Sequence, residues 1–194
     1  YIPEKVVPSV RGYFEEKIAI IGAGPIGLLA GMIAQAYGAH AILLDLVDER
    51  LQFAKELGIE YVINSKTEDT VKRISEITNC VMAQQVMECS GANAAIRSTL
   101  DLVSNAGRIT LTGWPKTETP LPTDLITKKE VDIRGARTSA GEFEEVIELI
   151  HSGRVDIKKI LTKVISIDEA PATIIDIEKN PGNYMKVVVQ VNEP

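Results

Sequence analysis

A short apolar segment that ends in a glycine-rich turn constrains this chain more than any other feature. The segment, residues 17–27, reads KIAIIGAGPIG, and a second apolar segment, residues 40–44, is followed directly by an aspartate. The stretch between them is typical of a helix. A strand, the turn Gly22-x-Gly24-x-x-Gly27, a helix, a second strand and an acidic residue about 20 residues after the turn are the pattern of a βαβ unit that binds a dinucleotide.

Each residue of the turn has a physical reason to be there. Gly22 allows the chain to leave the strand sharply, and Gly24 has no Cβ to keep the backbone away from a pyrophosphate. Gly27 allows the helix to pack closely on the sheet, and Pro25 fits the first helical turn, where its missing N–H would have had no partner. The free N–H groups and partial positive charge at the start of this helix predict a phosphate site.

Asp45 and Arg50 bear on the choice of cofactor. A carboxylate at the end of the second strand accepts hydrogen bonds from an adenosine ribose but repels a 2′-phosphate, so Asp45 favours NAD over NADP. Arg50 leaves this open in part, because a guanidinium could stack on adenine or pair with a 2′-phosphate. The alternative for Arg50 is a solvated arginine at the start of the next helix.

Strand-like and helix-like segments alternate along the chain after Asp45. We expect strands at 61–63, 85–89, 108–111 and 131–135, and helices at 48–57, 69–77, 93–103 and 142–151. Such alternation predicts an α/β Rossmann fold, a doubly wound parallel sheet with helices on both faces. Residues 114–123 contain three prolines and are predicted to form a loop.

The two ends of the chain have a different character from its middle. We expect an NAD-binding Rossmann domain at residues 15–153. Residues 1–14 and 154–194 are interpreted as remnants of a catalytic domain, the second being a segment that returns to it.

Composition excludes several classes of protein. The net charge of −6, without a basic stretch, argues against a nucleic-acid partner. No apolar run reaches the ~20 residues that span a bilayer, so a membrane protein is not expected. The only cysteines are Cys80 and Cys89 and the only histidines His40 and His151, and their spacing fits neither a metal site nor a disulfide framework. We expect a cytoplasmic protein.

Four segments resemble the zinc-dependent medium-chain alcohol dehydrogenases, in their sorbitol and polyol dehydrogenase branch. IAIIGAGPIGLL at residues 18–29 resembles the cofactor loop of that family, and VMECSGANAAI at 86–96 is similar to the segment beside its nicotinamide site. KEVDIRGAR at 129–137 resembles the sixth strand of the polyol branch. The ending at 168–191 is similar to the return of the chain into the catalytic domain. The resemblance covers residues 17–191, nearly the whole chain.

The resemblance implies a set of cofactor-binding residues. Those implied to hold the pyrophosphate are Gly22, Gly24, Pro25, Ile26 and Gly27. Those implied to hold the adenosine end are Asp45 and Arg50. Those implied to lie along the nicotinamide side are Cys89, Ser90, Gly91, Thr112, Gly113 and Arg137. The alternatives are that Cys89 is a small buried hydrophobe, that Ser90 and Gly91 cap a helix, and that Arg137 is a surface charge.

The resemblance also implies a reaction. In the family, zinc lowers the pKa of a substrate hydroxyl and hydride passes from that carbon to NAD, so the substrate would be a secondary alcohol of a polyol, sugar alcohol or sugar acid. The zinc ligands of the family belong to an N-terminal domain, and no catalytic residue or metal ligand is expected in this chain. We therefore interpret it as a fragment, an internally deleted form or an incomplete sequence.

The sequence is also compatible with two other functions, and it predicts an assembly. A non-catalytic NAD-binding module and an NADPH-dependent, zinc-free quinone-type reductase are the alternatives to a dehydrogenase. Enzymes that this sequence resembles dimerise by continuing their sheets across a two-fold axis, so we expect a homo-oligomer formed through the sheet edge near Val131.

Overall fold

The computed structural model describes residues 15–137 and 141–191. The chain forms two compact units, Tyr1–Val155 and Asp156–Pro194, which are described separately. The segment 1–14, interpreted above as a remnant of a catalytic domain, lies outside the described residues.

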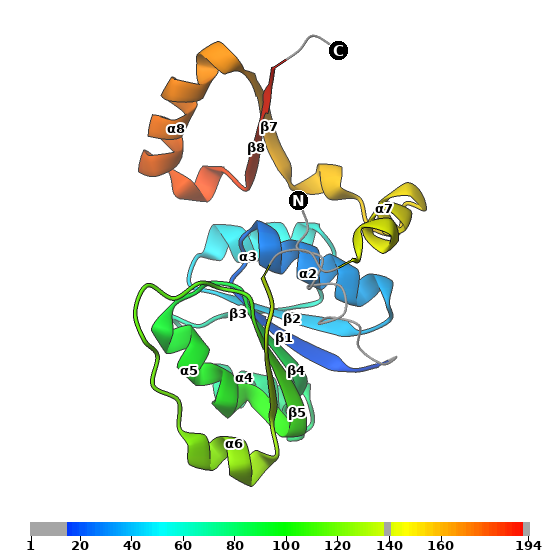
Figure 1. Cartoon of the computed structure of the whole chain (residues 1–194), viewed down its shortest axis with the longest axis vertical. Helices are drawn as coiled ribbons and strands as arrows, with labels where there is room; N and C mark the ends of the chain where they lie inside the picture. Colours follow the sequence, from blue (N-terminus) through cyan, green and yellow to red (C-terminus); the bar gives the residue numbers. More distant parts are fainter. Residues whose placement is uncertain (1–14, 138–140, 192–194) are drawn as a thin grey trace. The chain divides into compact units, whose positions relative to one another are not determined.

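The first unit is built on a six-stranded parallel sheet (Figure 1). Its strands are β1 (Lys17–Ile21), β2 (His40–Asp45), β3 (Tyr61–Asn64), β4 (Ala83–Glu88), β5 (Val103–Leu111) and β6 (Asp132–Gly135). Their order is β3-β2-β1-β4-β5-β6, and every neighbouring pair is parallel. This is the order of a doubly wound Rossmann fold, and it confirms the predicted fold class.

Helices cover both faces of the sheet. In Figure 1, α2 (Pro25–Ala36) and α3 (Asp48–Glu56) lie on one face, and α4 (Thr70–Ile77) and α5 (Asn93–Leu102) lie on the other. The helix α7 (Phe143–His151) follows β6 in the chain. Neighbouring parallel strands need a long connection, which is usually a helix and runs in a right-handed sense. The alternation of strands and helices along the chain was therefore sufficient to predict helices on both faces of the sheet.

One helix was not predicted. The sequence indicated a proline-rich loop at 114–123 and no helix between that loop and the strand predicted at 131–135. The structure has the helix α6 (Thr123–Lys129) in this interval. It has seven residues and no buried one, so it lacks the apolar periodicity from which a helix is recognised.

The core explains the continuous apolar runs of the central strands. Every residue from Ile18 to Ile21 and from Ala41 to Leu44 is buried. A parallel sheet with helices on both faces buries side chains that point in either direction, so these strands do not alternate between apolar and polar residues.

The second unit is a parallel pair of strands joined by a helix. β7 (Leu161–Ser166) pairs with β8 (Lys186–Gln190), and α8 (Ala170–Lys179) connects them. None of the helices within residues 15–137 and 141–191 has the length and apolar composition needed to cross a membrane.

Candidate functional site

The carboxyl ends of four strands meet at one edge of the sheet. Gly22 follows β1, Asp45 ends β2, Glu88 ends β4 and Thr112 follows β5. The neighbours β1 and β4 are where the strand order reverses, and in open α/β sheets the crevice outside this point is where ligands bind. The topology therefore brings most of the predicted site residues to the place where a ligand site is expected.

The three glycines of the turn have three different environments. Gly22 has a φ of +108°, and a Cβ added there would lie 3.3 Å from the backbone nitrogen of Ser90. A Cβ on Gly27 would lie 1.8 Å from the carbonyl oxygen of Gly22, so the helix can only pack against the turn without one. A Cβ on Gly24 would meet nothing within 4 Å. Gly22 and Gly27 are thus required by the fold, whereas Gly24 faces open space.

The start of α2 has no acidic side chain of its own. Pro25 is its first residue, the capping residue Gly24 offers no side-chain hydrogen bond, and the first turn contains no acidic residue. The first intrahelical bond runs from the N–H of Leu28 to the carbonyl oxygen of Gly24, at 2.9 Å. The N–H groups of Ile26 and Gly27 precede that bond, in the part of a helix that lacks intrahelical partners. Unfilled space beside free N–H groups is what a pyrophosphate would need.

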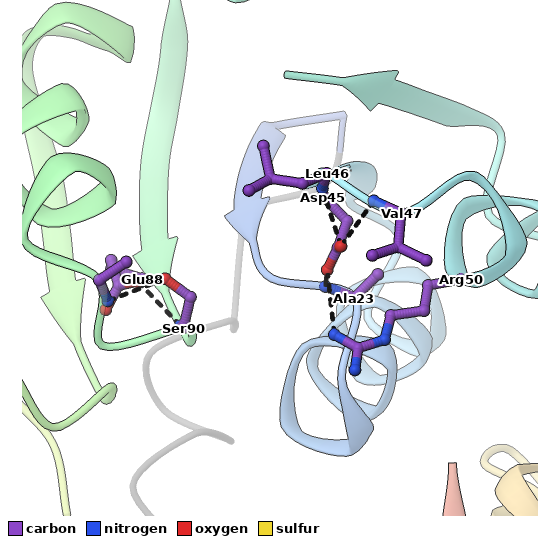
Figure 2. Close-up of polar contacts among 8 residues, drawn as sticks. Ala23, Asp45, Leu46, Val47, Arg50, Glu88 and Ser90 are labelled. Carbon is purple, nitrogen blue, oxygen red and sulfur yellow. Dashed lines mark hydrogen bonds and ion pairs between the residues drawn. The ribbon is translucent and has the colours of Figure 1, made fainter. Parts of the chain in front are cut away.

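Asp45 holds the glycine turn against the end of β2 (Figure 2). Its Oδ2 accepts a hydrogen bond from the N–H of Ala23 at 2.6 Å, and its Oδ1 accepts bonds from the N–H groups of Leu46 and Val47 at 2.8 and 3.0 Å. The side chain is only 9% exposed. Each carboxylate oxygen can accept about two bonds, so Oδ2 retains a free lone pair. Asp45 can therefore order the turn and still accept one bond from a ligand.

Arg50 lies beside this carboxylate. Its Nη1 is 3.8 Å from Oδ2 of Asp45, and its side chain is 32% exposed. The distance is that of an ion pair rather than a hydrogen bond. Arg50 is thus held at the same site as Asp45 and retains donors for another group.

A cavity of about 510 Å³ opens from this corner of the sheet. It extends from Gly22, Asp45 and Arg50 across to Ser90 and to α4 and α5, and its walls are mainly apolar. This volume lies within the range of small-molecule sites, and an apolar cavity with a few polar groups at one end suits a planar base joined to a sugar.

Glu88 is a site residue that the sequence analysis missed. Its side chain is fully buried, and among the described residues it is the only charged one in the core. Its Oε1 accepts bonds from the N–H and the hydroxyl of Ser90 and from the N–H of Gly91, as Figure 2 shows in part. A signal was available, because an acidic residue ends this buried strand just as Asp45 ends β2.

The residues predicted for the nicotinamide side are packed together. A Cβ on Gly113 would lie 2.1 Å from the backbone nitrogen of Gly91, and one on Gly91 would lie 2.7 Å from the carbonyl oxygen of Trp114. The guanidinium of Arg137 stacks on the ring of Trp114, with 4.2 Å between its Cζ and the ring centroid. Trp114 was not predicted as part of this group.

Cys89 has an environment that suppresses thiol chemistry. Burial raises the pKa of its thiol from about 9 to about 12, although a hydrogen bond with Thr112 opposes this, and the nearby charge of Glu88 raises it further. The thiol stays protonated at neutral pH, so it acts as a small apolar group rather than as a nucleophile or metal ligand. Its contact with a cofactor stays a prediction.

Within residues 15–137 and 141–191, no three His, Cys, Asp or Glu side chains are arranged to hold a metal ion. The side chains that the structure describes therefore do not fit a catalytic zinc, which needs three protein ligands.

The strand order, the glycine turn and the acidic end of β2 together define a Rossmann fold with a dinucleotide-type site. The sequence pattern of the zinc-binding dehydrogenases matches residues 25–152. The chain belongs to the zinc-binding dehydrogenase family.

Individual relatives agree with this assignment. An uncharacterised zinc-type alcohol dehydrogenase-like protein of Haemophilus influenzae is 54% identical over 172 residues, which are 89% of this chain and 50% of that protein. Sorbitol dehydrogenase of Bacillus subtilis is 34% identical over 177 residues, which are 90% of this chain and 50% of the relative. The crystal structure of a 2R,3R-butanediol dehydrogenase from Bacillus subtilis matches with a TM-score of 0.88 and 27% identity, covering 97% of this chain and 55% of the other. The chain thus spans about half the length of the relatives it matches.

Proposed function

We propose that this chain is the NAD-binding part of a zinc-dependent dehydrogenase that oxidises a secondary alcohol of a polyol, sugar alcohol or sugar acid to a ketone. The observation that carries the proposal is the open space at Gly24, next to a helix whose first turn has no acidic residue. When bound, NAD accepts a hydride from the alcohol carbon. The residues of this chain bind and orient it.

The proposed division of the site follows the strand ends. Gly22, Gly24, Pro25, Ile26 and Gly27 are proposed to bind the pyrophosphate. Asp45 and Arg50 are proposed to bind the adenosine ribose and base. Cys89, Ser90, Gly91, Thr112, Gly113 and Arg137 are proposed to line the nicotinamide side.

NAD is proposed rather than NADP because of the free lone pair on Oδ2 of Asp45. Asp45 lines the cavity, and this oxygen, which accepts one bond from Ala23, can accept another from a ribose hydroxyl. A 2′-phosphate would instead bring like charges together in a partly buried place, where their repulsion is stronger than in water. Arg50 offsets this only in part, because it already pairs with Asp45.

Titration of the chain with NADH and NADPH, followed by nucleotide fluorescence, tests this proposal. We expect NADH to bind at least ~10-fold more tightly, and Asp45→Asn to remove most of the difference, because a hydrogen bond to a charged group is worth about 1.5–3 kcal/mol. Glu49→Gln is the matched control, since it removes the same charge from an exposed position four residues away. Equal binding of the two nucleotides by the unaltered chain would contradict the proposal.

The remaining parts of the dehydrogenase are proposed to belong to the half of the relatives that this chain does not match. These parts include the zinc ligands and most of the alcohol pocket. Residues 154–194 are proposed to be the segment that returns to that domain. The protein is proposed to be cytoplasmic, in keeping with two free cysteines.

A homo-oligomer is proposed through the free edge of β6. Asp132 and Arg134 are exposed on this strand and form an ion pair, with 2.8 Å between Oδ2 and Nη2. Two copies related by a two-fold axis would align antiparallel edges, and opposite charges at i and i+2 suit such an arrangement. Arg134→Asp makes the edge wholly acidic and is expected to convert the oligomer to a monomer in light scattering. A monomeric unaltered chain at tens of micromolar would contradict this assembly.

A further inference from the structure

Glu88 links two loops that are far apart in the sequence, one through its buried carboxylate and the other through its main-chain oxygen. The side chain accepts bonds from Ser90 and Gly91 directly after β4, with distances of 2.8 Å to the Ser90 nitrogen and 3.0 and 3.1 Å from its two oxygens to the Gly91 nitrogen. The main-chain oxygen of the same residue accepts three bonds from the loop after β5. These come from the N–H and hydroxyl of Thr112, at 2.9 and 2.6 Å, and from the N–H of Gly113, at 3.0 Å.

The two loops pack closely against each other and against the carboxylate at Gly113. A Cβ on Gly113 would lie 2.4 Å from Oε2 of Glu88 and 2.1 Å from the nitrogen of Gly91. The carboxylate is fully buried, so its position is defined by these bonds rather than by solvent. A buried carboxylate that accepts several N–H and O–H bonds fixes its donors more firmly than a neutral acceptor would.

Glu88 thus has a counterpart in Asp45. Asp45 ends β2 and holds the N–H of Ala23 in the glycine turn, whereas Glu88 ends β4 and holds the N–H groups of Ser90 and Gly91. Figure 2 shows the two carboxylates at their respective strand ends. Each one fixes a loop of the proposed cofactor site. Asp45 borders the cavity itself, whereas Glu88 acts on it through Ser90, which lines it.

We propose that Glu88 is a positioning residue that fixes the nicotinamide half of the cofactor site without touching the cofactor. The inference rests on the proposed function, because it assigns the loops at Ser90 and Thr112 to the nicotinamide end. It follows that loss of the carboxylate weakens binding of the nicotinamide end more than binding of the adenosine end, which Asp45 and Arg50 still hold.

Glu88→Gln tests this with little change of shape. In the variant, a side-chain NH₂ group replaces one carboxylate oxygen. Two donors then face each other, because the N–H of Gly91 donates to both oxygens of the glutamate. We expect affinity for NADH to fall about 10-fold or more, the usual effect of losing a hydrogen bond to a charged group, and affinity for ADP to fall by a clearly smaller factor. Ser90→Ala removes one donor to the carboxylate. It is expected to lower the ratio of NADH affinity to ADP affinity by a smaller factor than Glu88→Gln does.

Two controls separate positioning from general destabilisation. Thr78→Val removes a buried hydroxyl that donates to the carbonyl oxygen of Ile74 and accepts a bond from the N–H of Met82. This hydroxyl lies at the amino end of β4, whereas the proposed site lies at the carboxyl ends of the strands. The variant is expected to lower the melting temperature without changing the ratio of NADH to ADP affinity. Amide hydrogen exchange adds a measurement without ligand. In Glu88→Gln, the amides of Ser90 and Gly91 should exchange about 10-fold faster or more, while that of Ala23 is unchanged.

The outcomes are distinct. A selective loss of NADH affinity together with faster exchange at Ser90 and Gly91 supports the inference. Equal loss of NADH and ADP affinity, or unchanged exchange at Ser90 and Gly91, overturns it even if the unaltered chain binds both nucleotides. Failure of the unaltered chain to bind either nucleotide overturns the proposed function itself, and the inference with it.

Discussion

Gly24→Ala and Gly27→Ala add the same methyl group to the same turn, and the structure predicts opposite consequences for stability. At Gly24 the new Cβ meets nothing within 4 Å, and the φ of −77° suits alanine. Loss of chain entropy in the unfolded state favours the variant by about 0.4–1 kcal/mol, and a poorer helix cap costs about the same. The free energy of unfolding should therefore change by less than about 1 kcal/mol.

The methyl group of Gly24→Ala instead fills the space proposed for the pyrophosphate. Losing one hydrogen bond from the helix start to a charged phosphate costs about 1.5–3 kcal/mol, so the affinity for NADH should fall about 10-fold to 100-fold. The variant is expected to be as stable as the unaltered chain and defective in binding.

Gly27→Ala should instead damage the fold. Its Cβ would lie 1.8 Å from the carbonyl oxygen of Gly22, whereas real Cβ contacts essentially never fall under 3.0 Å. Either α2 or the turn must therefore move by more than an ångström, and such overpacking costs about 1–3 kcal/mol. For a domain of this size that lowers the melting temperature by roughly 2–12 °C.

Thermal unfolding followed by circular dichroism, and NADH titration of the same samples, measure both effects. Gly182→Ala is the control, because a Cβ there also meets nothing within 4 Å and the residue lies in the second unit. The reasoning is refuted if Gly24→Ala binds NADH as the unaltered chain does, or if Gly27→Ala unfolds at the same temperature.

Three further predictions concern two side chains, Cys89 and Lys129. Iodoacetamide at pH 8 should modify the exposed Cys80 and leave Cys89 unmodified, because burial raises the pKa of the Cys89 thiol to about 12. Two adducts on the folded chain in mass spectrometry would contradict this. Since that pKa is higher in the folded state, the stabilising contribution of the thiol is complete below about pH 9 and is lost as the pH rises towards 12, so Cys89→Ala should show a smaller loss of stability over this interval. Lys129→Ala should lower the free energy of unfolding by about 1–2 kcal/mol, because the Nζ atom donates to two main-chain oxygens at the end of α5, at 2.7 and 2.9 Å. Lys128→Ala, at an exposed neighbouring position, should change it by less than about 0.5 kcal/mol in denaturant titrations, and equal effects would refute the assigned role of Lys129.

The sequence alone was sufficient for the βαβ unit and for the class of sheet. Pro25 and the glycines of the turn act through backbone conformation and local sterics, which depend on a few neighbouring residues. Apolar strands alternating with helices allow few topologies, because crossovers between parallel strands are right-handed. The first constraint depends on neighbouring residues and the second only on the order of strands and helices. Both could therefore be predicted from the sequence alone.

Tertiary structure decided which residues share a site and what each does there. Glu88 and Thr112 are 24 positions apart, and only the pairing of β4 with β5 brings them into contact. The sequence predicted different roles for Gly24 and Gly27, but only the structure shows that the Cβ position of Gly27 is occupied by the backbone of Gly22 and that of Gly24 is open. Contacts between strand ends depend on strand order and register, and these are properties of the assembled sheet rather than of any one segment.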